Sequence, residues 1–179
     1  MTDELLADSR RLLAELAPKA SDLSRRAANF ADQRGFAKAR LEGATDDERP
    51  IVLFVCEGNS GRSQAAAALL NAYAGARAIS WSAGSKPDSD INPDVVELLA
   101  RRNVDASGGY PKPWTAEILD VADVIVNLGA GDDLPVIEGK QNLTWDVGHP
   151  KGPGVAGATE LIELIDQHVN ELILSLGID

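Results

Sequence analysis

The feature that most constrains the fold is the stretch from Ile51 to Ser63. It begins with five apolar residues, Ile51 to Val55, without any polar alternation. Such a run is typical of a strand that is buried on both faces of a parallel sheet. A loop that contains two glycines follows, and strong helix formers begin at Ser63, which is placed to cap a helix. The pattern predicts a strand, a tight loop and a helix in direct succession.

The loop between this strand and this helix is suited to bind an anion. Its free backbone N–H groups and the helix dipole both favour negative charge, and glycines let the backbone curl into a nest of donors. Arg62 closes the loop and can hold two oxygens of a tetrahedral oxyanion. We therefore expect the substrate to be bound by the loop residues, which are Glu57, Gly58, Asn59, Ser60, Gly61 and Arg62.

The single cysteine of the chain, Cys56, stands where the strand ends. Helix N-termini and nearby cations can lower a thiol pKa from ~8.5 to as low as ~4, so we expect a thiolate here. A thiolate aimed at a bound oxyanion can attack phosphorus or arsenic in line. The simpler alternative is that Cys56 is only a small buried apolar residue. The strand before it, the helix after it and the Cys-x5-Arg-Ser spacing favour the catalytic interpretation.

Composition limits the possible partners and compartments. The net charge of −11 argues against nucleic acids and anionic membranes as partners. No apolar run approaches the ~20 residues that span a bilayer, and the N-terminus lacks the pattern of a signal peptide. One cysteine cannot form an internal disulfide, and two histidines far from it give no metal-ligand spacing. We expect a cytoplasmic protein without a bound metal or cofactor.

Residues 1 to 48 are predicted to form a helical extension. Leucines recur at helical spacing up to Leu16, and Pro18 is predicted to end that first helix. Ser21 can cap a second helix, which Gly35 is predicted to interrupt before a further short helix. Two or three short amphipathic helices must pack on something, and we favour a homodimer through this extension over packing on the same chain.

Residues 50 to 179 are predicted to form one α/β domain. The predicted strands cover 51–55, 77–82, 124–128 and 142–147, and helices follow from Ser63, from Asn92, over 115–121 and after 157. Strands that alternate with helices indicate a four-stranded parallel sheet with helices on both faces. In such sheets ligands bind beyond the carboxyl ends of the strands, where Cys56 lies.

The ordered motifs over about residues 50 to 175 resemble the low-molecular-weight protein tyrosine phosphatase superfamily. Besides the Cys-x5-Arg-Ser loop they include 82–87 (SAGSKP), 111–113 (PKP) and 122–125 (ADVI). The segment from Asn59 to Leu70 looks more like the arsenate reductase branch. The resemblance implies that Cys56 is the nucleophile, that Ser63 stabilises its thiolate and that Asn59 braces the loop.

This sequence departs from the thioredoxin-dependent arsenate reductases at two positions. Those enzymes carry two further cysteines in and after a Cys-Gly-Asp-x-Cys-Pro stretch, whereas this chain has Ala130 and Leu134 there. A second thiol must then come from outside. Single-cysteine relatives resemble arsenate–mycothiol transferases, which pass arsenic to mycothiol and leave its release to a mycoredoxin. The resemblance therefore implies an arsenic-detoxifying enzyme with an external thiol as co-substrate.

The proton donor is left open by the sequence. In the family an Asp before a Pro, after the fourth strand, protonates the leaving oxygen, and here His149 stands at that position. Asp146 is the other candidate, and a third possibility is that neither residue acts. A general acid contributes about 10²- to 10⁴-fold to a rate.

Two other functions compete with arsenate reduction. A phosphotyrosine phosphatase would need a reliable acid and aromatic walls around its slot, and neither is evident in the sequence. An oxyanion-binding module without turnover would keep the loop and lose the chemistry. Turnover of arsenate, hydrolysis of aryl phosphates, and binding without turnover distinguish the three.

Overall fold

The computed structural model describes residues 3–178, with side chains from residue 6 onward. It contains two compact units, which divide between Phe36 and Ala37. Among the described residues, no helix is both long and apolar enough to cross a bilayer. The site discussed below lies in the second unit.

The N-terminal extension is one helix, α1 (Asp3–Leu41), and the prediction of two or three short helices is wrong. Pro18 lies inside α1. A proline removes one helical hydrogen bond and costs ~3 kcal/mol. Here the residues on both sides are mostly Ala, Leu, Arg, Lys and Glu, which are strong helix formers and offset that cost. Gly35 also stays within the helix, because one glycine costs only ~1 kcal/mol there.

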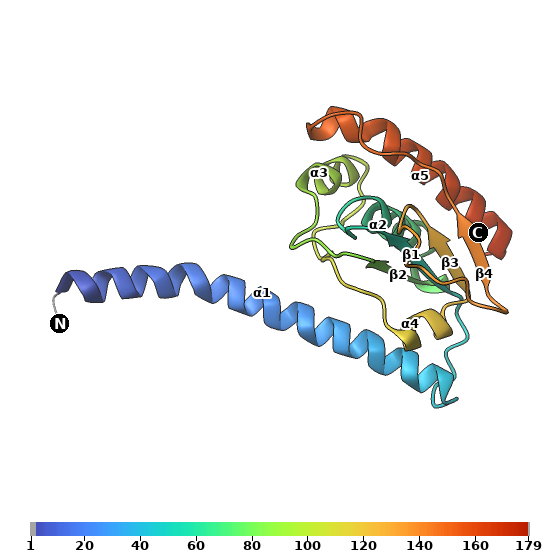
Figure 1. The fold of residues 1–179 in the computed structure, drawn as a ribbon, viewed down its shortest axis with the longest axis horizontal. Coiled ribbons are helices and arrows are strands. Elements are labelled where there is room, and N and C mark those ends of the chain that lie inside the picture. Colours follow the sequence, from blue (N-terminus) through green and yellow to red (C-terminus); the bar gives the residue numbers. More distant parts are fainter. Residues whose placement is uncertain (1–2, 179) are drawn as a thin grey trace. The chain divides into compact units, whose positions relative to one another are not determined.

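The second unit is built on a four-stranded parallel sheet, which confirms the predicted fold class (Figure 1). Its strands are β1 (Ile51–Cys56), β2 (Ile79–Gly84), β3 (Val124–Asn127) and β4 (Gln141–Thr144), in the order β2-β1-β3-β4. The order reverses beside β1, since β2 lies on one side of it and β3 on the other. Ligands bind at such a switch point, and Cys56 ends the strand that forms it.

Helices cover both faces of the sheet. They are α2 (Arg62–Ala74), α3 (Pro93–Arg101), α4 (Ala116–Val121) and α5 (Gly154–Leu176). Val52, Phe54 and Cys56 of β1 belong to the core cluster that contains residues of α2, α3 and α5. Alternate residues of a strand point to opposite faces, so the equally buried Leu53 and Val55 face the other way. In Figure 1, α4 lies on that other side of the sheet.

Several element boundaries differ from the predictions by a few residues, and the last helix begins at Gly154 rather than after residue 157. The second strand begins at Ile79 rather than at residue 77, because Gly75–Arg77 forms a 3-10 turn after α2. The fourth strand ends at Thr144 and does not reach residue 147. The helix after the anion loop begins at Arg62 with Gly61 at the N-cap, so Ser63 does not cap it. The Ser63 hydroxyl has other partners, which are described below.

Candidate active site around Cys56

The sulfur of Cys56 lies at the carboxyl end of β1, at the floor of a cavity of about 370 Å³. The loop residues Glu57, Gly58, Ser60, Gly61 and Arg62 line this cavity together with Cys56. Cys56 is only 1% exposed, so a reagent reaches the sulfur through this cavity. The structure thus brings together Cys56, the predicted nucleophile, and all but one of the predicted substrate-binding residues. The exception is Asn59, which is fully buried behind the loop.

The segment from Ser85 to Asn92 orients the peptides of the loop. Its backbone N–H groups donate to four loop carbonyls: Ser85 to Cys56 (3.2 Å), Lys86 to Glu57 (2.8 Å), Asp88 to Gly58 (2.9 Å) and Asn92 to Ser60 (2.8 Å). In a planar trans peptide the N–H points opposite to the C=O. Each of these four carbonyls shares a peptide group with the N–H of the following residue. That N–H is therefore turned away from the segment, toward the inside of the bend. This is the arrangement that an oxyanion requires.

Glycine at position 84 permits the close approach of β2 to the loop. A Cβ on Gly84 would lie 2.6 Å from the Glu57 carbonyl oxygen and 2.8 Å from the Asn59 Cβ. Asn59 itself has a φ of 47°, in the left-handed region that asparagine tolerates better than most residues. The loop is thus shaped by contacts from a second strand, as well as by its own glycines.

A buried chain of hydrogen bonds leads from Asn59 to the sulfur. The Asn59 Nδ2 donates to the Ser63 Oγ at 2.8 Å, and that Oγ lies 2.9 Å from the Cys56 Sγ. Because the Ser63 oxygen accepts from Asn59, its own proton is free to point at the sulfur. Ser63 and Asn59 are both 0% exposed, so water does not compete for these bonds. The geometry is suited to stabilise a thiolate at Cys56.

The other end of Asn59 is held by the segment from Tyr110 to Pro113. The Lys112 backbone N–H donates to the Asn59 Oδ1 at 3.0 Å. The Gln64 Nε2 donates to the carbonyls of both Asn59 (3.0 Å) and Tyr110 (2.8 Å). The Lys112 ammonium lies over the Tyr110 ring, 4.4 Å from its centroid, and burial lowers the pKa of Lys112 to about 8. The sequence analysis noted residues 111–113 only as a family motif and assigned them no role.

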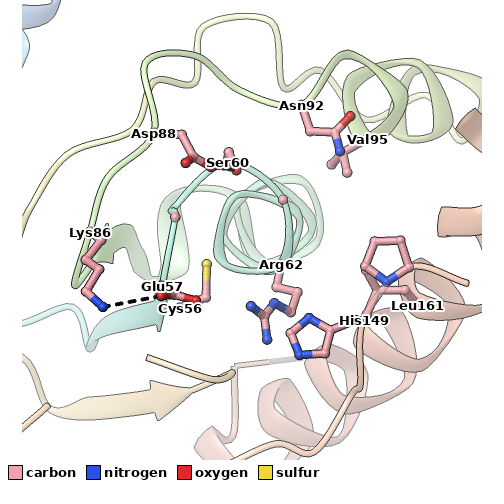
Figure 2. A pocket seen from close by; sticks show the side chains of 13 residues that line it. Cys56, Glu57, Ser60, Arg62, Lys86, Asp88, Asn92, Val95, His149 and Leu161 are labelled. Carbon is pink, nitrogen blue, oxygen red and sulfur yellow. Dashed lines mark hydrogen bonds and ion pairs between the residues drawn. The ribbon is translucent and has the colours of Figure 1, made fainter. Parts of the chain in front are cut away.

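Arg62 is held at the mouth of the cavity. Its Nη1 donates to the Leu128 carbonyl at 2.8 Å. Gly129 follows with a φ of 101°, and a Cβ there would collide with the guanidinium of Arg62. The backbone after β3 therefore fixes one nitrogen of Arg62 and leaves the rest of the guanidinium to face an anion. Figure 2 shows Arg62 beside His149, on the opposite side of Cys56 from Lys86.

The two candidate proton donors lie in different places. His149 lines the cavity that contains Cys56, whereas Asp146 lines only a neighbouring cavity below Arg62. Arg62 and His149 line both of these cavities, and a third cavity as well. His149 therefore lies on the cavity that contains the sulfur, and Asp146 does not.

The rim of the cavity carries two charged side chains, Lys86 and Asp88, to which the sequence alone gave no role. Lys86 forms an ion pair with Glu57 at 3.6 Å, and Ser60 donates a short hydrogen bond to Asp88. Lys86 lies within the motif at 82–87 and Asp88 follows it, but nothing in their spacing indicates that they border the site. Among the described residues, no three His, Cys, Asp or Glu side chains are grouped so that they could hold a metal ion.

Comparison with known proteins places this site in context. Residues 51–179 match the family model described as "Low molecular weight phosphotyrosine protein phosphatase". An arsenate reductase of Bacillus subtilis is 33% identical over 91 residues, which cover 50% of this chain and 65% of the relative. The chain spans about 60 to 65% of the length of the curated relatives that it matches.

Two solved structures are similar over most of this chain. A thioredoxin-dependent arsenate reductase of Corynebacterium glutamicum is 39% identical, with a TM-score of 0.76 over 84% of this chain and 73% of the other. A low molecular weight protein tyrosine phosphatase of T. tengcongensis is 25% identical, with a TM-score of 0.61 over 70% of this chain and 99% of the other. Both activities thus occur on folds similar to this one.

Proposed function

Because the chain belongs to the low molecular weight phosphotyrosine protein phosphatase family, we propose that it is an arsenate reductase with Cys56 as its nucleophile. The observation that carries this proposal is the hydrogen-bonded sulfur at the floor of an anion loop, in a chain whose similar proteins include arsenate reductases. The loop amides and Arg62 would hold the arsenate oxygens, and Ser63 would stabilise the thiolate.

The overall reaction needs two thiols. One singly charged arsenate anion, one proton and two thiols give arsenous acid, one disulfide and water, so arsenic gains the two electrons that the sulfurs lose. In the first step a sulfur–arsenic bond forms and an arsenic–oxygen bond breaks, with the oxygen leaving as water. Arsenic remains pentavalent until a second sulfur attacks the first, which forms the disulfide and releases arsenite.

The second thiol must be external, because Cys56 is the only cysteine in the chain. Ala130 and Leu134 stand where a relay would need sulfur, so the thioredoxin dependence of the Corynebacterium relative does not transfer directly. We propose that a low-molecular-weight thiol, mycothiol, is the co-substrate and that a mycoredoxin completes the cycle. A reactive thiol of this kind stays reduced in the cytoplasm, which is the compartment that we propose.

His149 is the better candidate for the general acid. The departing oxygen of arsenate points away from the sulfur in an in-line attack, toward the mouth of the cavity. His149 lines that cavity, and Asp146 does not. The protonated imidazole of His149 can deliver the proton that turns the departing oxygen into water.

The test is arsenite formation by purified protein with arsenate, mycothiol, mycoredoxin and a regenerating reductant. We expect turnover by the wild type and none above background by Cys56→Ser. A wild type that makes no more arsenite than Cys56→Ser would refute the proposal. Rapid hydrolysis of an aryl phosphate without arsenate turnover would favour the phosphatase function. Tight binding of arsenate without turnover under any thiol would favour the binding module.

We also propose that the extension at residues 1–48 mediates a homodimer. Apolar residues in α1 are spaced alternately by three and four, the repeat of a coiled-coil seam: Leu13, Leu16, Ala20, Leu23, Ala27 and Phe30. The three leucines are 67%, 55% and 63% exposed in the single chain. Light scattering on Leu16→Glu/Leu23→Glu should show monomers, whereas Ala14→Glu/Ala28→Glu, off the seam, should leave the dimer. A monomeric wild type would refute this.

A further inference from the structure

A second cavity adjoins the one that contains Cys56. Its volume is about 480 Å³, within the range of cavities that bind small molecules. It shares Glu57, Arg62, Lys86 and His149 with the first cavity, so the two open into each other around these side chains. The proposed chemistry of arsenate does not use the second cavity. An arsenate ion occupies only a small part of the first, so a larger molecule can reach the arsenic from the second.

The wall of the second cavity is formed by the backbone that follows β3, from Gly129 to Asp133. Its start is fixed in place: the N–H groups of Gly129 and Ala130 donate to the Asn127 Oδ1 at 2.9 and 2.8 Å. The hydrogen bond from Arg62 to the Leu128 carbonyl holds the same turn against the anion loop. The start of this wall is therefore held by the same turn that holds Arg62.

The charge of the cavity lining is uneven. Three carboxylates border it, Glu57, Asp132 and Asp133, and the first of these already pairs with Lys86 at 3.6 Å. The other two are exposed, and neither forms an ion pair with another residue in the described part of the chain. An anion held at Arg62 adds further negative charge at one end of the cavity. Lys86 offsets Glu57, and a bound anion offsets Arg62, so Asp132 and Asp133 leave an excess of fixed negative charge for a molecule that enters here.

We propose that this second cavity binds the co-substrate thiol and selects thiols that carry no net negative charge. The inference rests on the proposed arsenate reductase function and names the class of its second substrate. The thiol sulfur would approach the arsenic from the side of His149, while the remainder of the molecule lies along Gly129 to Asp133. Asp132 and Asp133 are specificity-determining residues in this arrangement.

The step at this site is the one already balanced above. The bound thiol loses its proton to solvent. Its sulfur then either forms a bond with arsenic while the bond from arsenic to the Cys56 sulfur breaks, or forms a disulfide with the Cys56 sulfur while that same bond breaks, its electron pair reduces arsenic and arsenite leaves. An anionic thiol would have to bring a second negative charge to within a few ångströms of Asp132 or Asp133. Like charges at that distance in a watery cleft disfavour binding about 3- to 10-fold each at low salt.

The experiment compares three small thiols of different charge at one pH and low ionic strength: 3-mercaptopropionate, 2-mercaptoethanol and cysteamine. Arsenate-dependent thiol consumption is measured with each, after subtraction of the Cys56→Ser background. Each rate is divided by the rate at which the same thiol reduces a free aromatic disulfide, which removes differences in nucleophilicity. We expect the wild type to prefer cysteamine over 3-mercaptopropionate by about 10-fold or more, and the preference to shrink at 0.5 M salt.

The variant Asp132→Asn/Asp133→Asn should lower that preference to about 3-fold or less. The matched control is Asp120→Asn/Glu163→Gln, which changes the net charge equally at residues outside the cavity and should keep the wild-type preference. Turnover with no charge preference, or a preference that both double variants alter equally, would overturn this inference and leave the proposed function standing. Absence of turnover with every thiol would instead refute the proposed function, and this inference with it.

Discussion

Removal of the Ser63 hydroxyl is the most direct perturbation of the site. The Ser63 Oγ lies 2.9 Å from the Cys56 sulfur and accepts the Asn59 Nδ2–H at 2.8 Å. Ser63→Ala removes one donor from the sulfur and leaves the Asn59 amide without its acceptor. The substitution makes the buried position apolar and adds no volume, so the loop backbone has no steric reason to move.

The expected magnitude follows from the strength of a hydrogen bond to a charged group. Such a bond contributes about 1.5–3 kcal/mol, and it is present only when the sulfur is a thiolate. Every ~1.4 kcal/mol is a factor of ten in an equilibrium constant, so the equilibrium between thiol and thiolate should shift about 10- to 100-fold toward the thiol. The unpaired Asn59 amide should in addition lower the free energy of unfolding by about 1–3 kcal/mol.

The assay is alkylation of the single cysteine by iodoacetamide between pH 5 and 10, followed by mass spectrometry. In the pH range where the rate still rises with pH, Ser63→Ala should react about 10- to 100-fold more slowly, and it should match the wild type in strong alkali. Ser63→Thr keeps the hydroxyl and should recover most of the rate. Ser80→Ala is the matched control, because the Ser80 Oγ donates to the Ala67 carbonyl at 2.9 Å and takes no part in the hydrogen bonds that lead to the sulfur.

The reasoning is refuted if Ser63→Ala alkylates within twofold of the wild type across the whole pH range while remaining folded. It is also refuted if sulfate, added as an arsenate mimic, changes the alkylation rate of neither protein. The first result would show that the Ser63 hydroxyl does not stabilise a thiolate. The second would show that the loop does not hold an anion near Cys56.

Three further predictions follow from the same geometry. Gly129→Ala puts a Cβ into the guanidinium of Arg62 at a φ of 101°, so sulfate or arsenate affinity, measured by calorimetry, should fall about 10-fold or more; unchanged affinity would contradict the role given to this turn. His149→Gln should lower kcat for arsenate about 10²-fold and Asp146→Asn less than 3-fold, with KM nearly unchanged, and the reverse order in steady-state kinetics would show that Asp146 is the acid. Burial lowers the pKa of Lys112 from 10.5 to about 8, so the unfolded chain binds more protons between these values and stability rises with pH in that window. The unfolding free energy in urea of the wild type minus that of Lys112→Met should therefore increase by about 2 kcal/mol from pH 7 to 9.5, and a constant difference would contradict the burial of the ammonium.

Local patterns in the sequence predict the centre of this site well. The apolar run before Cys56, the glycines after it and the helix formers from Ser63 identify a strand, a loop and a helix, and the structure contains all three. The same local reasoning failed at α1, where Pro18 and Gly35 were expected to break the helix. Each of these residues destabilises a helix by a limited amount. In a long helix the favourable propensities of many neighbouring residues add up and outweigh that amount.

The role of Ser63 shows what local reasoning cannot decide. Its position suggests an N-cap, yet Gly61 occupies the cap and the Ser63 hydroxyl turns to the sulfur. A serine near a helix start can form either bond, and only the placement of Cys56 and Asn59 around it selects one. The position of the two candidate acids is a similar case, because the path of the chain after β4 brings His149 into the cavity and leaves Asp146 outside.

The sequence by itself determined the fold class, through the alternation of strand and helix patterns, and the position of Cys56 in a loop between a strand and a helix, which depends on spacing within a short run of residues. Only the tertiary structure decided which distant residues complete the site. The segment from Ser85 to Asn92 aims the loop amides, Lys112 holds Asn59 from behind, and the turn after β3 holds Arg62 and walls the second cavity. These segments meet at Cys56 because the sheet order places β2 and β3 on either side of β1, and that order arises from packing between elements far apart in the chain.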